Sequence, residues 1–137
     1  MNVLVILALA AAAFVLAGRT YGGFIARRLG EDRSRPTPAV TSCDHRDFVP
    51  TKNYVVFAHH FSAIAGAGPI LGPTMAVLYG FVPAWLWVVL GGIFIGAVHD
   101  FTTLFVSVRE GGRSMAEVAR RTLGPSGFNL FIAFTIV

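Results

Sequence analysis

The chain contains a long stretch without a fixed charge, and this stretch restricts it to a membrane fold. No Asp, Glu, Lys or Arg occurs from Asn53 to His99, and Met1–Gly18 is uncharged as well. About a quarter of the residues in a soluble domain are charged, whereas 13% of this chain is charged and 55% is hydrophobic. Because about 20 consecutive apolar residues cross a bilayer as a helix, we expect an all-α, polytopic transmembrane protein.

Turn residues and charges divide the apolar sequence into about three complete spans and the start of a fourth. The expected spans are residues 3–18, or 3–29 if the helical pattern continues to Gly30, then 54–79, 84–108 and 128–137. The last segment is about half as long as a crossing helix. We therefore expect residues 1–137 to be the N-terminal part of one transmembrane transporter domain, with loops at 30–53 and 109–127.

The basic residues predict the topology of these spans. All 11 Lys and Arg residues lie in two windows, Arg19–Lys52 and Arg109–Arg121. One span precedes the first window and two separate the windows, so both face one side, which the positive-inside rule identifies as the cytoplasm. The N-terminus is then outside. The topology thus accounts for the net charge of +4, and nucleic-acid binding is not needed to explain it. The expected partner is the lipid bilayer.

A cleaved signal peptide is an alternative for the first apolar segment. Its n-region, Met1-Asn2, has no basic side chain, and the positive charge follows the apolar run instead of preceding it. This order of charges favours a span that is not cleaved.

The second expected span is interrupted in its middle by Gly66, Gly68, Pro69 and Gly72-Pro73. Proline inside a helix costs roughly 3 kcal/mol. In hydrocarbon, the freed backbone groups are tolerated only where protein or a water-filled cavity satisfies them. Interrupted spans are the best sequence indication of a transporter's binding site, so we predict a discontinuity at Gly66–Pro69. A structural kink stabilised by neighbouring helices is the alternative.

The predicted break gives two half-helices whose ends face a gap. Pro69 suits the first turn of the second half-helix, where no amide donor is missed. We expect the amides of Ile70 and Leu71 to point into the gap as a partial positive pole that suits a carboxylate. Carbonyls before Gly66 form a partial negative pole, which suits a proton or sodium site together with Asp100.

Asp100 is predicted to lie near the bilayer midplane. It precedes Arg109 by nine residues, which is about 13–14 Å of helix in a hydrocarbon core of ~30 Å. The break lies at a comparable depth, so the two can meet. Intramembrane carboxyls are functional by default, although a tight helix contact containing a satisfied Asp is the alternative. Asp100 belongs to a small polar stripe made of Gly92, Gly96, Asp100, Thr103 and Ser107.

The histidines and the cysteine give weaker indications. His59 shares a helical face with Gly66 and is a candidate for the substrate or ion pathway, while His60 points about 100° away; both also suit an interfacial position. Cys43, the only cysteine, excludes an internal disulfide. The Cys43-Asp44-His45 segment lacks the further ligands of a zinc site, so we expect no metal, cofactor or catalytic residue.

Two long motifs occur in a distinctive order. The first runs from Asp47 to Phe61 and continues through Ala65–Pro69 to Gly72-Pro73, and the second comprises Gly96–Phe101 and Ser107–Ser114, with shorter pieces at Ala26–Arg28 and Pro36–Val40. From roughly Tyr21 to Pro125, the chain resembles the N-terminal portion of the carbon starvation protein A family.

The resemblance implies a multi-pass protein of the bacterial inner membrane that takes up small peptides, or pyruvate in some members, when carbon is scarce. We expect a proton-coupled secondary transporter with Asp100 as the carrier, and not an enzyme. Two alternatives stay open. One is a sensor that binds nutrient without transport, and the other is a membrane-embedded metal enzyme that uses His59, His60, His99 and Asp100.

Overall fold

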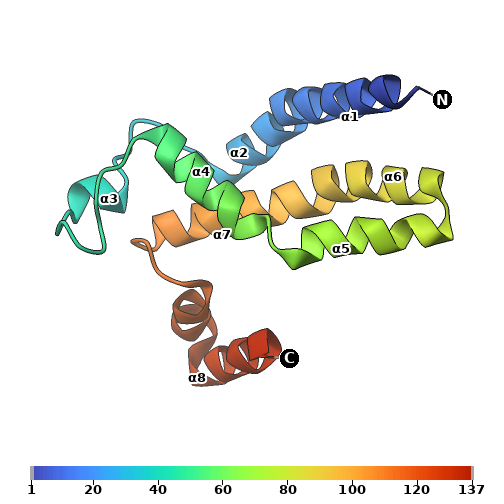
Figure 1. The fold of residues 1–137 in the computed structure, drawn as a ribbon. Helices are drawn as coiled ribbons and strands as arrows, with labels where there is room; N and C mark the ends of the chain where they lie inside the picture. Colours follow the sequence, from blue (N-terminus) through green and yellow to red (C-terminus); the bar gives the residue numbers. More distant parts are fainter. Residues whose placement is uncertain (1, 137) are drawn as a thin grey trace. The chain divides into compact units, whose positions relative to one another are not determined.

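A computed structural model describes residues 2–136, and within this range the chain is helical and contains no strand (Figure 1). Two helices are long and apolar enough to cross a membrane, and a bent helix pair brings the number to three if it counts as one span. The predicted all-α, transmembrane class is confirmed. The helix after Gly124 is not among these spans, and a fourth span from Phe128 stays a prediction.

The first long helix covers Val3–Leu29, which is the longer of the two predicted lengths. It consists of α1 (Val3–Ala17), a π-helical turn η1 (Gly18–Gly22) and α2 (Gly23–Leu29). The side chain of Asn2 caps its start by accepting the Leu4 amide at 3.0 Å. Gly30 ends it with φ 69, a left-handed conformation that glycine adopts without a Cβ penalty.

The second apolar segment is a bent pair. Helix α4 (Asn53–Ile64) is followed by α5 (Ala67–Ala76) and a single 3₁₀ turn, η2 (Val77–Tyr79). The two halves meet at an angle of 53°. The predicted discontinuity of this span is therefore present in the structure.

The third apolar segment is one helix, Phe81–Arg109, built of α6 (Phe81–Gly91), a second π-helical turn η3 (Gly92–Gly96) and α7 (Ala97–Arg109). The predicted span 84–108 lies within this helix, which begins three residues before Ala84. Gly80, with φ 119, makes the reversal alone, and Pro83 falls in the first helical turn, where its missing amide costs nothing.

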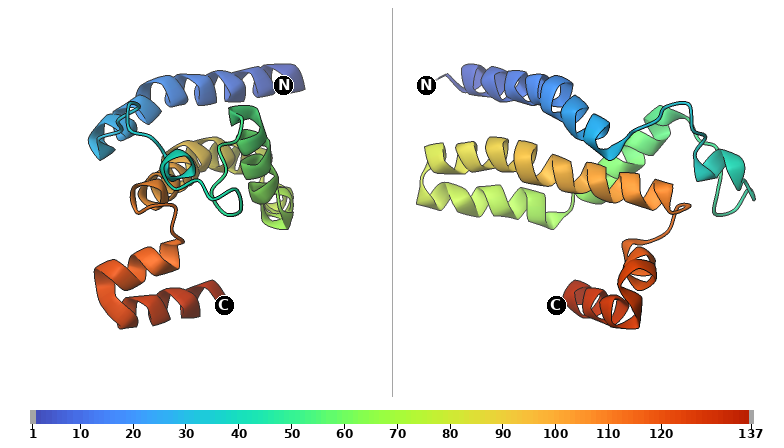
Figure 2. Two further views of the ribbon diagram at one scale, coloured as in Figure 1. Left: turned by 90° about the vertical axis from the view of Figure 1, so that its left-hand side faces the viewer. Right: turned by 180° about the vertical axis from the view of Figure 1, so that it is seen from behind.

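The chain divides into two compact units, and the first comprises residues 1–32 and 51–99. In this unit α5 and α6 form an antiparallel hairpin (Figures 1 and 2). The first long helix contacts the third: the Tyr21 ring meets the Phe94 ring edge-on at 5.2 Å, and a Cβ on Gly92 would lie 3.3 Å from Phe14. Ala84, Val89 and Ile93 are buried here.

The second unit comprises residues 33–50 and 100–137. It contains the short helix α3 (Pro38–Thr41), most of α7, and α8 (Met115–Ile136). Thr37 is extended, and Pro38 takes the first position of α3, a favourable place for proline. Helix α8 has a sharp break at Gly124, with φ 79 and ψ −170, after which the helix resumes at once.

The turn after α7 depends on two glycines with positive φ, Gly111 (φ 81) and Gly112 (φ 77). The Gly112 amide donates to the Ser107 carbonyl at 2.8 Å, and the Ser107 hydroxyl donates to the Arg113 carbonyl at 2.6 Å. A Cβ on Gly112 would lie 2.7 Å from Cε1 of Phe48, whereas a Cβ on Gly111 would meet nothing within 4 Å. Only Gly112 thus combines backbone strain with a close contact.

This difference predicts unequal effects of two alanine substitutions. Gly111→Ala is expected to lose roughly 1–2 kcal/mol from left-handed strain alone. Gly112→Ala is expected to lose more, because its Cβ also displaces the Phe48 ring. Thermal midpoints of the purified protein, measured by fluorescence-detected size-exclusion chromatography, will show this order. In a Phe48→Ala background the two costs should become equal, and equal costs in the unmodified background would contradict the assignment.

Candidate functional site

The break between α4 and α5 consists of Ala65 and Gly66. Ala65 leaves the helical region with φ −72 and ψ 48, and Gly66 is extended with φ −83 and ψ −168. The Ala65 amide donates to the Phe61 carbonyl at 2.9 Å, and the Gly66 amide donates to the Ile64 carbonyl at 2.7 Å. The remaining carbonyls of the last turn, those of Ser62 and Ala63, lie at the end of α4 where a helix offers no further donors.

The free amides of α5 lie earlier than expected. Because α5 starts at Ala67, its orphan donors are the amides of Ala67 and Gly68, while Pro69 occupies the third position and has no donor to lose. The amide of Ile70 falls within the regular i to i−4 ladder, and so does that of Leu71. The expected positive pole at Ile70 and Leu71 therefore moves to Ala67 and Gly68, two residues that sequence reasoning assigned to the gap.

The surroundings of the break are open. Gly66, Gly68, Pro69 and Ile70 are all exposed in the chain. A Cβ on Gly66 or Gly68 would meet nothing within 4 Å. Within residues 2–136, these two glycines therefore make no close packing contact.

His59 lies within α4, less than two turns before its end, and is exposed. Its expected shared face with Gly66 assumed a continuous helix. Since α4 ends at Ile64, that phase relation ends with it, and after His59 only Ser62 and Ala63 continue its face within α4. The role of His59 in a pathway stays a prediction.

Pro73 introduces a second irregularity, inside α5. It removes the amide that would otherwise donate to the carbonyl of Pro69. At the next residue, the Thr74 hydroxyl donates to the Ile70 carbonyl at 2.7 Å. The backbone of the second span is thus modified over two consecutive turns, from Ala65 to Pro73.

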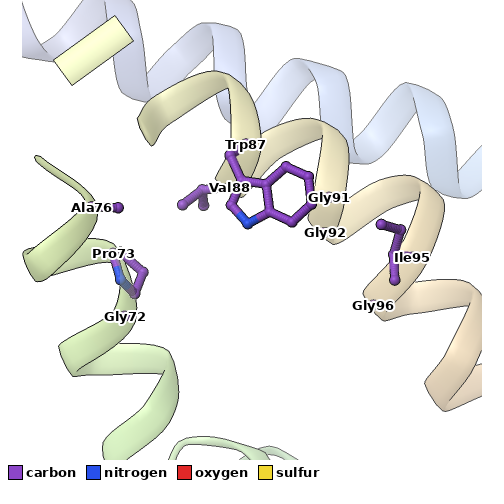
Figure 3. A pocket seen from close by; sticks show the side chains of 9 residues that line it. All are labelled: Gly72, Pro73, Ala76, Trp87, Val88, Gly91, Gly92, Ile95 and Gly96. Atoms are coloured by element: carbon purple, nitrogen blue, oxygen red, sulfur yellow. The ribbon is translucent and has the colours of Figure 1, made fainter. Parts of the chain in front are cut away.

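A groove of about 430 Å³ lies between α5 and the helix formed by α6 and η3, within the first unit (Figure 3). Of the predicted site residues, it includes only Gly96. Sequence analysis named Gly72-Pro73 as part of the interruption and Gly92 as part of the small polar stripe, but it did not predict a groove between them, and it missed the remaining lining residues. The lining residues are Gly72, Pro73, Ala76, Trp87, Val88, Gly91, Gly92, Ile95 and Gly96.

Asp100 and Thr103 lie one turn apart on the same face of α7, and both are half-buried. Ser107, one turn further, fixes the turn after α7 through its bond to Arg113. Asp100 and Thr103 belong to the second unit, whereas the break belongs to the first. Their meeting in one site stays a prediction from depth along the helices.

The Cys43–His45 segment forms a hydrogen-bonded loop. Oδ1 of Asp44 accepts the amides of Arg46 at 2.9 Å, Asp47 at 2.9 Å and Phe48 at 2.8 Å. These bonds, with that of Phe48 first, lower the pKa of the Asp44 carboxyl from its ordinary value of 3.8. Across residues 2–136, no three His, Cys, Asp or Glu side chains gather as a possible metal site.

Several arginines lie at helix ends or in a charged cluster. Arg27 and Arg28 occupy the last turn of α2, and Arg109 that of α7, where positive charge complements the helix dipole. In α8, Glu117 faces three arginines at 3.9–4.0 Å, namely Arg113, Arg120 and Arg121. These pairs are largely exposed and contribute little to stability in water.

Helices of membrane-crossing length and a broken apolar pair define the class as a polytopic helical membrane protein. The sequence pattern described as Carbon starvation protein CstA matches residues 2–137. The chain therefore belongs to the carbon starvation protein CstA family.

Named relatives agree with this assignment. The chain is 48% identical to "Peptide transporter CstA" of Campylobacter jejuni over 81% of its length and 16% of that relative. It is 40% identical to "Peptide transporter CstA" of Bacillus subtilis over 99% of its length and 24% of that relative. It is also 44% identical to "Pyruvate/proton symporter BtsT" of Escherichia coli over 82% of its length and 16% of that relative.

The chain thus spans about a sixth to a quarter of the length of these relatives. No solved structure matches it.

The assignment of the break to Ala65–Gly66 and the first turn of α5 predicts that helix-forming residues will straighten the pair. The triple variant Gly66→Ala/Gly68→Ala/Pro69→Ala replaces three poor helix formers by the best one. Removing the 53° bend should lengthen the distance between the ends of the pair by roughly 4 Å, given 1.5 Å of rise per residue.

The measurement is a spin-label distance between cysteines introduced at Tyr54 and Leu78 in a Cys43→Ser background, which removes the one cysteine of residues 1–137. Gly72→Ala is the matched control, because it changes a glycine of the same helix away from the break and its Cβ meets nothing within 4 Å. An unchanged distance in the triple variant would show that neighbouring helices, and not these residues, impose the bend.

Proposed function

We propose that the intact protein is a secondary active transporter of the bacterial inner membrane that takes up small peptides or pyruvate-like carboxylates, coupled to protons. In this proposal the N-terminus is outside and the basic loops are cytoplasmic. The names of the relatives support transport of a peptide or of pyruvate with a proton. No catalytic residue, cofactor or metal is part of the proposal.

The broken second span is the observation that carries the proposal. The exposed amides of Ala67 and Gly68 form the positive end of a half-helix, and such ends bind carboxylates. Small peptides and pyruvate share a carboxylate, so one pole suits both classes. In transporters, discontinuous helices of this kind form the substrate and ion sites near the midplane.

Asp100 is proposed as the proton carrier. It is the only Asp, Glu, Lys or Arg in the long segment Phe81–Val108, and its position, nine residues from Arg109, is about 13–14 Å of helix from the charged end. A carboxyl at that depth costs about 2.5–3.5 kcal/mol when charged and at the helix centre. A proton carrier must alternate between a neutral and a charged form during transport. This role would explain why a carboxyl is present at such a costly position.

Asp100→Asn is expected to abolish proton-driven accumulation of substrate, because an amide cannot carry the proton. A loss of at least about tenfold in accumulation, equal to about 1.4 kcal/mol, should be seen in proteoliposomes with an imposed pH gradient. Peptide and pyruvate are tested side by side. Asp47→Asn is the matched control, since Asp47 lies exposed in the 30–53 loop.

Two results would change the proposal. Wild-type accumulation by Asp100→Asn would remove the carrier role of Asp100 and leave transport in place. Substrate binding by the unmodified protein without any flux would indicate a nutrient sensor instead of a transporter.

A further inference from the structure

The groove between α5 and α6 has apolar walls and room created by small residues. Pro73 and Ala76 from α5 face Trp87 and Val88 from α6, and four glycines are among the lining residues (Figure 3). A Cβ on Gly72 would meet nothing within 4 Å, so the space beside it is open. The indole of Trp87, 67% exposed, forms part of the rim.

Both walls of the groove carry irregular backbone. On one side Pro73 interrupts the hydrogen-bond ladder of α5, and on the other side Gly92 and Gly96 bound the π-helical turn η3. At membrane depth such irregularities are tolerated where they are buried in protein or line a cavity, and π-helical turns are frequent at functional sites. The interruption at Pro73 and the π-helical turn η3 thus border the same groove from two sides, which indicates that a ligand or another part of a protein occupies it.

The groove lies next to the proposed carboxylate pole. Gly72, in its lining, follows Gly68 by four residues, which is about 6 Å along α5. An extended peptide advances about 3.3 Å per residue. If the carboxylate of a peptide binds the amides of Ala67 and Gly68, the peptide side chain one or two residues away therefore lies at the level of the groove.

The size of the groove distinguishes the two substrate classes. A volume of about 430 Å³ lies within the range of ligand sites, about 300–1,000 Å³. Pyruvate has one methyl group and cannot fill such a space. A leucine or phenylalanine side chain can cover the apolar walls and exclude water from them.

We propose that this groove is a subsite for an apolar side chain of a transported peptide, which makes small peptides with a large apolar residue the preferred substrate. The proposal rests on the proposed transport function. Ala76, Trp87 and Val88 provide the contacts, while Gly72 and Gly91 keep the space open.

The test compares uptake of Leu-Leu, Gly-Gly and pyruvate by the intact protein in proteoliposomes under one pH gradient. Ala76→Leu fills the groove from α5, and Ala58→Leu makes the same change at an exposed residue of α4 outside it. The ratio of kcat/KM for Leu-Leu to that for Gly-Gly should fall about tenfold or more in Ala76→Leu, as expected for a misfitted apolar group. Ala58→Leu should keep the ratio.

A second variant guards against misfolding. Trp87→Ala removes the rim and should also lower the ratio while uptake of Gly-Gly and pyruvate continues. An equal fall for all three substrates in both groove variants, or no change in the ratio, would overturn the subsite and indicate a lipid acyl chain or another helix in the groove.

Failure of the transport proposal has a different signature. If the unmodified protein moves none of the three substrates, the transport function fails, and binding of Leu-Leu to the purified protein, followed by tryptophan fluorescence, then decides the subsite. Saturable binding that Ala76→Leu weakens supports it, and absence of binding overturns it. A wild-type protein that moves pyruvate but neither peptide keeps the transport function and overturns the peptide subsite.

Discussion

The requirement that backbone polar groups be satisfied in hydrocarbon governs this structure. The first and third apolar segments meet it by forming continuous helices of 27 and 29 residues. The second segment does not, because Ala65 and Gly66 leave the helical conformation and Pro73 lacks an amide. The groups freed there need partners from other helices, from water or from substrate, which is why this segment is the place to look for function.

The two π-helical turns extend the same reasoning to the helices that look continuous. Each contains glycines at both ends, Gly18 and Gly22 in η1 and Gly92 and Gly96 in η3. Glycine permits close approach of a neighbouring helix, and the contact between Gly92 and Phe14 is of this kind. The third helix therefore combines tight packing against the first helix with an open groove beside α5.

The sequence allowed the helical class, the three apolar segments and the break to be predicted, because each follows from charge-free length or from Gly and Pro. It did not allow the π-helical turns to be predicted, since no residue type distinguishes a five-residue from a four-residue hydrogen-bond step. The positive pole was placed at Ile70 because Pro69 was taken as the start of the half-helix, whereas the structure starts it at Ala67. The groove was missed because it depends on how α5 pairs with α6.

The positive end of α5 and the groove complement each other when they are considered as one site. A helix N-terminus binds any carboxylate and cannot distinguish a keto acid from a peptide. An apolar groove binds any hydrophobic group and cannot orient it. In the proposed site, the amides of Ala67 and Gly68 would hold the carboxylate of the substrate, and the groove beside Gly72, about 6 Å further along the helix, would accept the side chain that follows. The selectivity of such a site would depend on the distance between two nonselective elements, and the single turn of helix between Gly68 and Gly72 would set that distance.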